Sequence, residues 1–220
     1  MMSSIVLLLV RRAGPQPKTK VSPRRKPGPI GSLSKCDCTR RRPRVPLPAQ
    51  LLYLRNMRPR PTARVLLLDA TNRLLLIRMH DPAVGGADGA VLRDAYWVTI
   101  GGAIEPDETP EETARRELIE ETGLADARLG PNVWYTEHVL TVAGEKRLLQ
   151  EHFFVAHTGR SDLATAGWTD LERRVIRDMR WWPLPDLLES GDIFFPSSLR
   201  RHLPALLENG PPSEIIRIEP

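Results

Sequence analysis

The sequence predicts an α/β fold in which helices flank a mixed β-sheet. Apolar runs of strand length recur between residues 62 and 184, one strongly capped helix interrupts them, and two further helical segments follow. Helices before and after a mixed sheet give an α/β/α sandwich. A chain of 220 residues has room for one sizeable core and a tail.

The first two predicted strands span residues 62–69 and 73–78, joined by a turn at Ala70-Thr71-Asn72. Their uninterrupted leucines predict that both faces of these strands are buried. A loop containing three glycines follows over residues 80–94. The third strand is then expected over residues 95–100, leading directly into a pair of glycines.

A helix is expected from Pro110 to Thr122, because both of its ends carry specific signals. Thr109 can act as N-cap with Glu112 three residues later, which is a capping box, and proline is tolerated at the first helical position. Gly123 follows the last periodic residue and can adopt the left-handed conformation that ends a helix.

The remaining elements follow the helix. Residues 132–141 and 147–157 predict two antiparallel strands about a turn at Ala143-Gly144. Another strand is expected over residues 175–184, then a short helix near residues 186–190 and a last helix over residues 197–208.

Three glutamates of the predicted helix are spaced to lie on one face. Glu117, Glu120 and Glu121 are related by i, i+3 and i+4, beside an apolar stripe of Ala114, Leu118 and Ile119. Like charges at this spacing repel, so their retention suggests a cation between them, and hard oxygen ligands favour Mg²⁺ or Mn²⁺. The alternative is an acidic face that is simply solvated, which is the commoner meaning of a charge run.

The wider spacing pattern changes that balance. Gly102 is followed after five residues by Glu108, then after seven by Arg116-Glu117-Leu118, and then, with single-residue gaps, by Glu120-Glu121 and Gly123-Leu124. This run resembles the Nudix box at every fixed position. In weaker form the resemblance covers residues 61–210, and it implies the Nudix type of α/β/α sandwich. One departure is Ile100, where many relatives have proline before the two glycines.

The resemblance implies roles for individual residues. Metal ligation is implied for Glu117, Glu120 and Glu121. Catalysis is implied for Glu120, Glu117 and Arg116, with Glu172 from a later segment as an outside candidate for the general base. Substrate binding is assigned to Gly101, Gly102 and Trp97, and structural roles to Glu108 and Gly123. Which glutamate acts as the base stays open, and each tryptophan is more commonly a core residue than a base-stacking platform.

The implied activity is Mg²⁺-dependent hydrolysis of a diphosphate bond in a nucleoside diphosphate linked to another moiety, with Mn²⁺ as an alternative ion. The substrate would be a nucleotide-type small molecule, and relatives often form homodimers. A non-catalytic Nudix-fold nucleotide sensor is the alternative from another functional class. A Nudix isomerase of isoprenoid diphosphates would need a cysteine in the domain, and both cysteines lie upstream at positions 36 and 38.

Residues 1–60 differ sharply from the rest of the chain. They hold fifteen Lys and Arg against one acid, a net charge of +14, whereas the remaining residues hold 17 bases and 26 acids, a net charge of −9. Nine of the 21 prolines also lie there. This composition predicts a disordered extension before a domain over residues 61–210 and a tail over residues 211–220.

Three interpretations of the basic segment stay open. It could be an organellar transit peptide, a nucleic-acid-binding arm, or a stretch upstream of a true start at Met57, which we favour. Its apolar run over residues 5–10 is too short to span a bilayer, and its charges follow that run instead of preceding it. We therefore expect a cytoplasmic protein with no membrane association.

Overall fold

The computed structural model describes residues 57, 59–163 and 170–220. Nearly all of the basic segment, and the predictions made for it, lie outside these residues. Among the helices of the described part, none is both long and apolar enough to cross a membrane.

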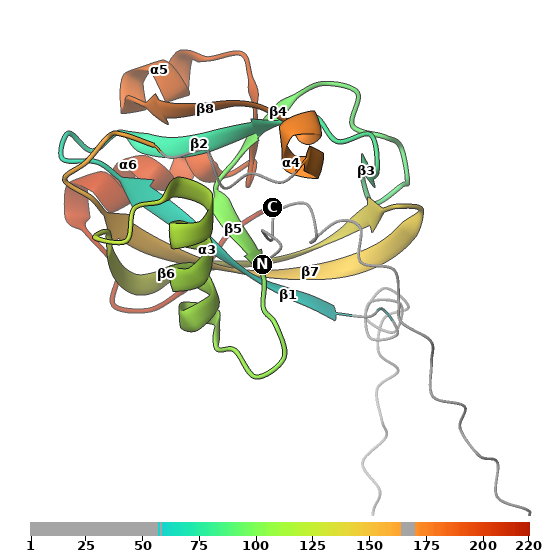
Figure 1. The fold of residues 1–220 in the computed structure, drawn as a ribbon, viewed down its shortest axis with the longest axis horizontal. Coiled ribbons are helices and arrows are strands. Elements are labelled where there is room, and N and C mark those ends of the chain that lie inside the picture. The colour runs from blue at the N-terminus through green and yellow to red at the C-terminus, as the bar shows by residue number, and fades with distance from the viewer. Residues whose placement is uncertain (1–56, 58, 164–169) are drawn as a thin grey trace, which may run out of the picture. The chain divides into compact units, whose positions relative to one another are not determined.

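In the described part of the chain, a run of strands precedes helix α3, two strands follow it, and helices and strands then alternate (Figure 1). In chain order they are β1 (Pro59–Leu68), β2 (Leu74–Met79), β3 (Val84–Gly85), β4 (Tyr96–Val98), β5 (Ile100–Ala103), α3 (Pro110–Thr122), β6 (Arg128–Val142), β7 (Glu145–His157), α4 (Asp170–Val175), β8 (Ile176–Trp182), α5 (Leu184–Glu189), β9 (Ile193–Phe195), α6 (Leu199–Asn209) and β10 (Ile216–Arg217).

The strands form one mixed sheet, as predicted. Its main path runs β10-β6-β7-β1-β2-β4-β9, with β3 paired to β6, β5 to β1 and β8 to β2. β6 and β7 form the predicted antiparallel hairpin, and Ala143 and Gly144 at its turn both have positive φ. β1 pairs in parallel with β7 and antiparallel with β5. β1 therefore links β7 to β5, the strand that contains the glycine pair Gly101-Gly102.

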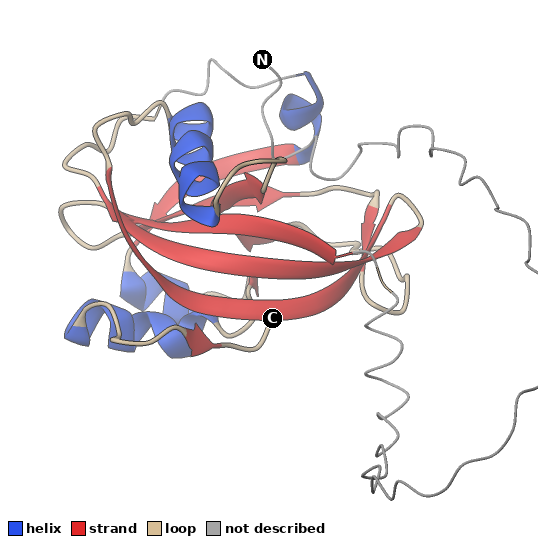
Figure 2. Ribbon diagram, turned by 90° about the horizontal axis from the view of Figure 1, so that it is seen from below, coloured by secondary structure: helices blue, strands red, loops and turns tan. Residues whose placement is uncertain are grey.

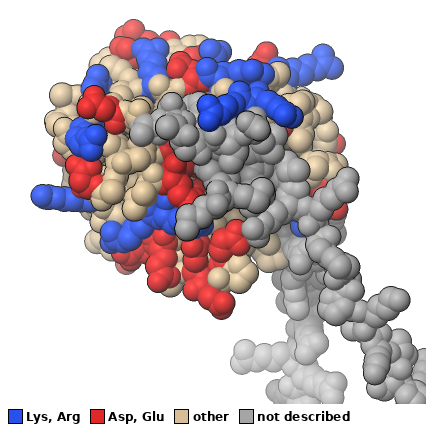
Figure 3. Space-filling view, viewed as in Figure 1, with Lys and Arg blue, Asp and Glu red and all other residues tan. Residues whose placement is uncertain are grey.

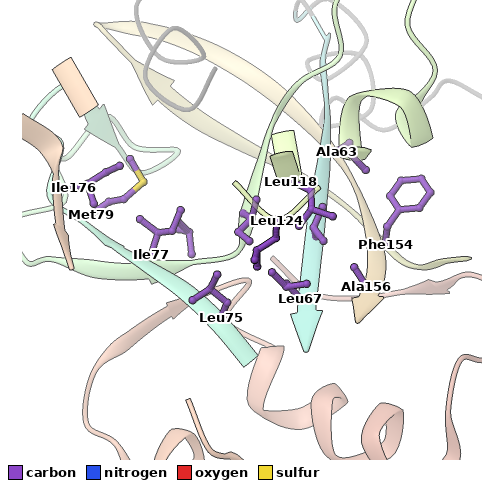
Figure 4. Packing of buried hydrophobic residues seen from close by; sticks show 14 of the residues in the cluster. Ala63, Leu67, Leu75, Ile77, Met79, Leu118, Leu124, Phe154, Ala156 and Ile176 are labelled. Carbon is purple, nitrogen blue, oxygen red and sulfur yellow. The ribbon is translucent and has the colours of Figure 1, made fainter. Parts of the chain in front are cut away.

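Helices cover both faces of the sheet (Figure 2). On one face, Leu118 from α3 and Leu124 from the turn after it pack with Leu67 and Ala156 (Figure 4). Ala114 of α3 belongs to the same cluster. On the other face, α6 supplies three leucines to a second core that also includes alternate residues of β1 and β2: Leu66, Leu68, Leu74 and Leu76. Both β1 and β2 contribute side chains to both cores, which is why their leucines are uninterrupted. The predicted burial of both faces of these strands is confirmed.

Several predicted boundaries were wrong. The strand expected over residues 95–100 is divided into β4 and β5 at Thr99, and the strand expected from residue 175 begins at Ile176, after the short helix α4. Short strands β3, β9 and β10 were not predicted, because two or three residues carry no periodic signal. Ile119 was placed in the apolar stripe of the helix, but its side chain is 47% exposed, since the buried face turns toward Leu118.

Candidate active site

Helix α3 has the two ends that the sequence predicted. The Thr109 hydroxyl accepts a hydrogen bond from the backbone N–H of Glu112, and the Glu112 carboxylate accepts one from the N–H of Thr109. Gly123 closes the helix at φ 71°, with its N–H bonded to the Ile119 carbonyl. Both ends of the helix that carries the glutamates are thus fixed by local contacts.

Arg116 holds three carboxylates together. Its Nε and Nη2 donate to the two oxygens of Glu108, at 2.8 and 2.9 Å. Its Nη1 lies 2.6 Å from Glu117 Oε1 and 3.3 Å from Glu120 Oε2, and Nη2 also donates to the Ala103 carbonyl. The planar fork therefore ties the helix to the loop before it and turns Glu117 and Glu120 toward one point.

Glu117 is fully buried against the backbone of the glycine pair. Its side chain has no exposed surface, and a Cβ built on Gly102 would lie only 2.0 Å from Glu117 Oε1 and 2.4 Å from its Cδ. Glycine at position 102 is thus required by the close approach of this carboxylate to the chain. The pattern has glycine at position 102 and glutamate at position 117 because the Glu117 carboxylate occupies the space that a side chain at position 102 would need.

Glu121 is attached to the preceding glycine. The Gly101 N–H donates to Glu121 Oε2 at 3.2 Å, and the Glu121 side chain is almost completely buried. Gly101 has φ 141°, and a Cβ there would meet the Ala63 carbonyl at 2.1 Å. The backbone conformation that presents this N–H to Glu121 is therefore available only to glycine.

The structure adds a buried ion pair that sequence reasoning missed. Arg64 lies on β1 directly opposite Gly101, and its Nε donates to Glu151 Oε1 on β7 at 2.8 Å. Burial alone would lower the pKa of Arg64, but Glu151, by its charge and hydrogen bond, and the charges of Glu121 and Glu117 raise it overall. Arg64 thus places a fixed positive charge within reach of the helix carboxylates.

Ion pairing also shifts the pKa values of Glu108 and Arg116, two residues of the Nudix-box pattern. The hydrogen bonds from Arg116 lower the pKa of Glu108 to about 2. Reciprocally, the hydrogen bond to Glu108 raises the pKa of Arg116, with Glu117 adding to the effect. Both side chains therefore keep their charges at any pH at which the protein would work.

A cavity of about 80 Å³ opens on the sheet beside the ion pair of Arg64 and Glu151. Arg64 and Glu151 form part of its lining, and most of the remaining lining is apolar. Asp and Glu side chains also gather over the lower part of the surface in Figure 3, where Figure 1 places α3 and the loop before it. The candidate site thus combines an acidic helix, a buried arginine and an apolar recess.

Two of the predicted site residues, Trp97 and Glu172, are not seen beside the cavity or the helix carboxylates. Trp97 was predicted to bind substrate, but its side chain is 2% exposed and packs edge to face on Trp182 in the second core. Its ring points away from the cavity because neighbouring residues of a strand alternate between faces, and Tyr96 lines the cavity instead. Glu172 lies in α4, and its side chain is outside the described residues.

The donor set suits a hard divalent cation. Glu117 and Glu120 converge on a single cationic nitrogen of Arg116, and Glu121 lies one helical turn from Glu117. Carboxylate oxygens are the preferred ligands of Mg²⁺ and Mn²⁺. Within the described residues no group of three or more Asp, Glu, His or Cys side chains is arranged so that it could hold a metal ion. Three carboxylates on one short helix nevertheless fit such an ion by their chemistry.

Comparison with known proteins supplies the family. A family model described as the NUDIX domain matches residues 58–202. Among solved structures, the chain is similar to the MutT protein from Methanosarcina mazei Go1, with 17% identity, a TM-score of 0.50, and coverage of 70% of this chain and 96% of that one.

A second solved structure gives the same result. It is the E. coli dihydroneopterin triphosphate pyrophosphohydrolase, with 17% identity, a TM-score of 0.50, and coverage of 70% of this chain and 97% of that one. At such identity the likeness establishes the fold. A comparison with curated proteins finds no match.

Proposed function

The chain belongs to the Nudix family, and from this premise we propose that it hydrolyses a diphosphate bond in a nucleoside diphosphate linked to another moiety. The observation that carries the proposal is the grip of Arg116 on Glu108, Glu117 and Glu120. It holds the glutamates of the box at fixed positions beside a glycine backbone. An acidic helix face that merely met solvent would not need such an arrangement.

Glu117, Glu120 and Glu121 are the residues that would hold a divalent cation, Mg²⁺ or Mn²⁺. When bound, such an ion would neutralise the oxygens of the diphosphate. Glu117 and Glu121 are buried and fixed by their contacts with Arg116 and Gly101. They are therefore suited to ligation, which needs stable geometry.

Glu120 is suited to a second role. Its side chain is 31% exposed, whereas that of Glu117 has no exposed surface. A general base has to reach the attacking water and then release its proton to solvent. We therefore favour Glu120 as the group that accepts the proton, and keep Glu172 as the outside candidate from the sequence.

Arg64 and the glycine backbone would hold the substrate. The guanidinium of Arg64 is buried beside the helix carboxylates and adds positive charge where a diphosphate would lie. Gly101 and Gly102 let the main chain come close to an anion, because neither carries a Cβ. The moieties on either side of the diphosphate would then extend toward the neighbouring cavity and toward solvent.

A substrate panel tests the proposal. The full chain with Mg²⁺ is incubated with dNTPs, ADP-ribose, NADH, dinucleoside polyphosphates, nucleotide sugars and dihydroneopterin triphosphate, and the products are identified by mass. We expect at least one compound to yield a nucleoside monophosphate or the corresponding pterin product. Failure to hydrolyse any of them would contradict the proposal.

The alternative is a nucleotide sensor that binds without turnover. All three glutamates of the helix are present: Arg116 holds Glu117 and Glu120, and the Gly101 N–H holds Glu121, which favours the enzyme. Glu120→Gln separates the two functions because it removes the charge with little change in shape. In an enzyme the substitution abolishes turnover and spares binding, whereas in a sensor there is no turnover for it to change.

A further inference from the structure

A second arginine of β1 lines the cavity at a distance from the glycine pair. Arg60 and Arg64 are four positions apart on β1, so they share one face of the sheet, and both line the cavity. Arg64 lies opposite Gly101, whereas Arg60 lies beside Leu149, near the end of the sheet where β1 and β7 begin (Figure 1). At about 3.3 Å per residue, the two backbone positions are about 13 Å apart along the strand. The cavity therefore has a cation beside the glycine backbone and another toward its far end.

Arg147 adds a further positive charge at this far end. It lies on β7 two positions before Leu149, so it occupies the same face of the sheet as that residue. Its Nη2 is paired with the carboxylate of Glu145, whose side chain is 64% exposed. Glu145 can balance one of the two charges of Arg60 and Arg147. One positive charge is thus left over.

Arg60 is half-buried without a counter-ion. It makes no hydrogen bond or ion pair with the residues that the structure describes, and its nitrogens keep surface that solvent can reach. Burial and the charges of Arg147 and Arg64 lower the pKa of Arg60 to about 10, so its guanidinium is still charged at neutral pH. Arginines that leave solvent are usually paired, because an unpaired charge is costly to bury. An anionic ligand would supply the missing partner.

We propose that Arg60 and Arg147 bind a phosphate monoester of the substrate, carried on one of the two moieties that the diphosphate links. The inference rests on the proposed function for the diphosphate itself, and it adds the substrate class: a nucleotide derivative with a further phosphate. A guanidinium presents its donors in a planar fork that matches a phosphate group. The separation of about 13 Å along β1 suits a phosphate beyond the diphosphate better than one adjacent to the cleaved bond.

Arg60→Met tests the inference, and Arg177→Met is a matched control. Arg177 is also a strand arginine, on β8, and also lacks an ion pair or hydrogen bond to the described residues, but it does not line the cavity. Methionine keeps an unbranched apolar side chain and removes the charge. Because Arg60 has no partner among the described residues and is repelled by Arg147 and Arg64, the melting temperature of Arg60→Met should not be lower than that of the wild type.

The probes are pairs that differ by one phosphate, titrated calorimetrically into the full chain with Mg²⁺. They are adenosine 5′-monophosphate with its 2′,5′- and 3′,5′-bisphosphate counterparts, and glucose 1-phosphate with glucose 1,6-bisphosphate. None contains a diphosphate bond, so binding is measured without turnover. We expect at least one bisphosphate to bind about tenfold or more tightly than its monophosphate, the usual effect of one charged hydrogen bond. Arg60→Met should abolish that difference and leave the monophosphate unchanged, whereas Arg177→Met should bind like the wild type.

Three results would overturn the inference. Equal binding of every bisphosphate and its monophosphate would mean that no site for a second phosphate exists. A difference that persists in Arg60→Met would place that phosphate elsewhere, and a lower melting temperature in this variant would mean that Arg60 already has a structural partner. A chain that distinguishes the bisphosphates but hydrolyses nothing in the substrate panel contradicts the proposed function alone.

Discussion

Replacing Gly102 by alanine should displace the carboxylate of Glu117 without breaking the fold. The added Cβ would lie 2.0 Å from Glu117 Oε1, 2.4 Å from Cδ and 2.8 Å from Oε2. Its three nearest neighbours are thus all atoms of one side chain. Gly102 does not have positive φ, so alanine is compatible with its backbone.

The distances set the size of the effect. Contacts of a Cβ below 3.0 Å are essentially never seen, so Glu117 Oε1 has to move by at least 1 Å. The carboxylate is fully buried and bonded to Arg116 Nη1 at 2.6 Å, and it cannot move without losing that bond. A misplacement of about 1 Å lowers catalytic rates roughly a hundredfold, and a lost charged hydrogen bond costs about 1 to 3 kcal/mol.

The assay is kcat/KM on the best compound of the substrate panel, together with thermal unfolding followed by circular dichroism. Gly191→Ala is the control, because a Cβ there meets nothing within 4 Å and its φ is not positive. We expect kcat/KM to fall about a hundredfold in Gly102→Ala and to stay unchanged in Gly191→Ala. If Gly102→Ala retained kcat/KM within about threefold of the wild type, the placement of Glu117 would not matter and the reasoning would be refuted.

Other substitutions probe neighbouring contacts. In Gly101→Ala the Cβ would lie 2.1 Å from the Ala63 carbonyl oxygen, at a φ of 141° that strains any residue with a side chain. We expect the free energy of unfolding by urea to fall by about 3 kcal/mol. A fall of less than about 1 kcal/mol would contradict the predicted clash. Arg116→Lys cannot contact both oxygens of Glu108, so kcat/KM should fall about tenfold or more, and an unchanged value would exclude an orienting role. Glu137 accepts hydrogen bonds from Gln150, Tyr135 and Arg217, which lower its pKa to about 2 from 4.5. Its charge therefore stabilises the fold above pH 4.5, and this contribution is lost as the pH falls toward 2. In Glu137→Gln we expect about 1 kcal/mol less stability at pH 7 and a smaller difference between pH 7 and pH 3, and parallel pH profiles for variant and wild type would contradict this.

The parts predicted correctly from sequence are those fixed by local contacts. Thr109, Pro110 and Gly123 determine the ends of α3 through neighbours within one helical turn, and the Ala143-Gly144 turn determines the β6–β7 hairpin. Such signals are contained in a few consecutive residues, so they can be read from the chain alone.

What was missed depends on contacts that are distant in sequence. Arg64 and Glu151 are 87 positions apart and meet because β1 pairs in parallel with β7, a pairing that no short pattern encodes. The cavity is likewise assembled from several strands, so its lining could not be assembled from any short stretch of the chain. The position of Trp97 in the second core depends on distant contacts too, because the partners of a short strand determine which of its faces meets a cavity.

The central claim is that diphosphate cleavage requires a cation held by the helix glutamates. The most direct test removes metal ions with EDTA and measures the cleavage rate as Mg²⁺ is added back. If Glu117, Glu120 and Glu121 hold a cation that the reaction requires, the best substrate of the panel should show no cleavage in EDTA. Its rate should then rise to a plateau as Mg²⁺ is restored. Cleavage at the full rate in excess EDTA would contradict the account.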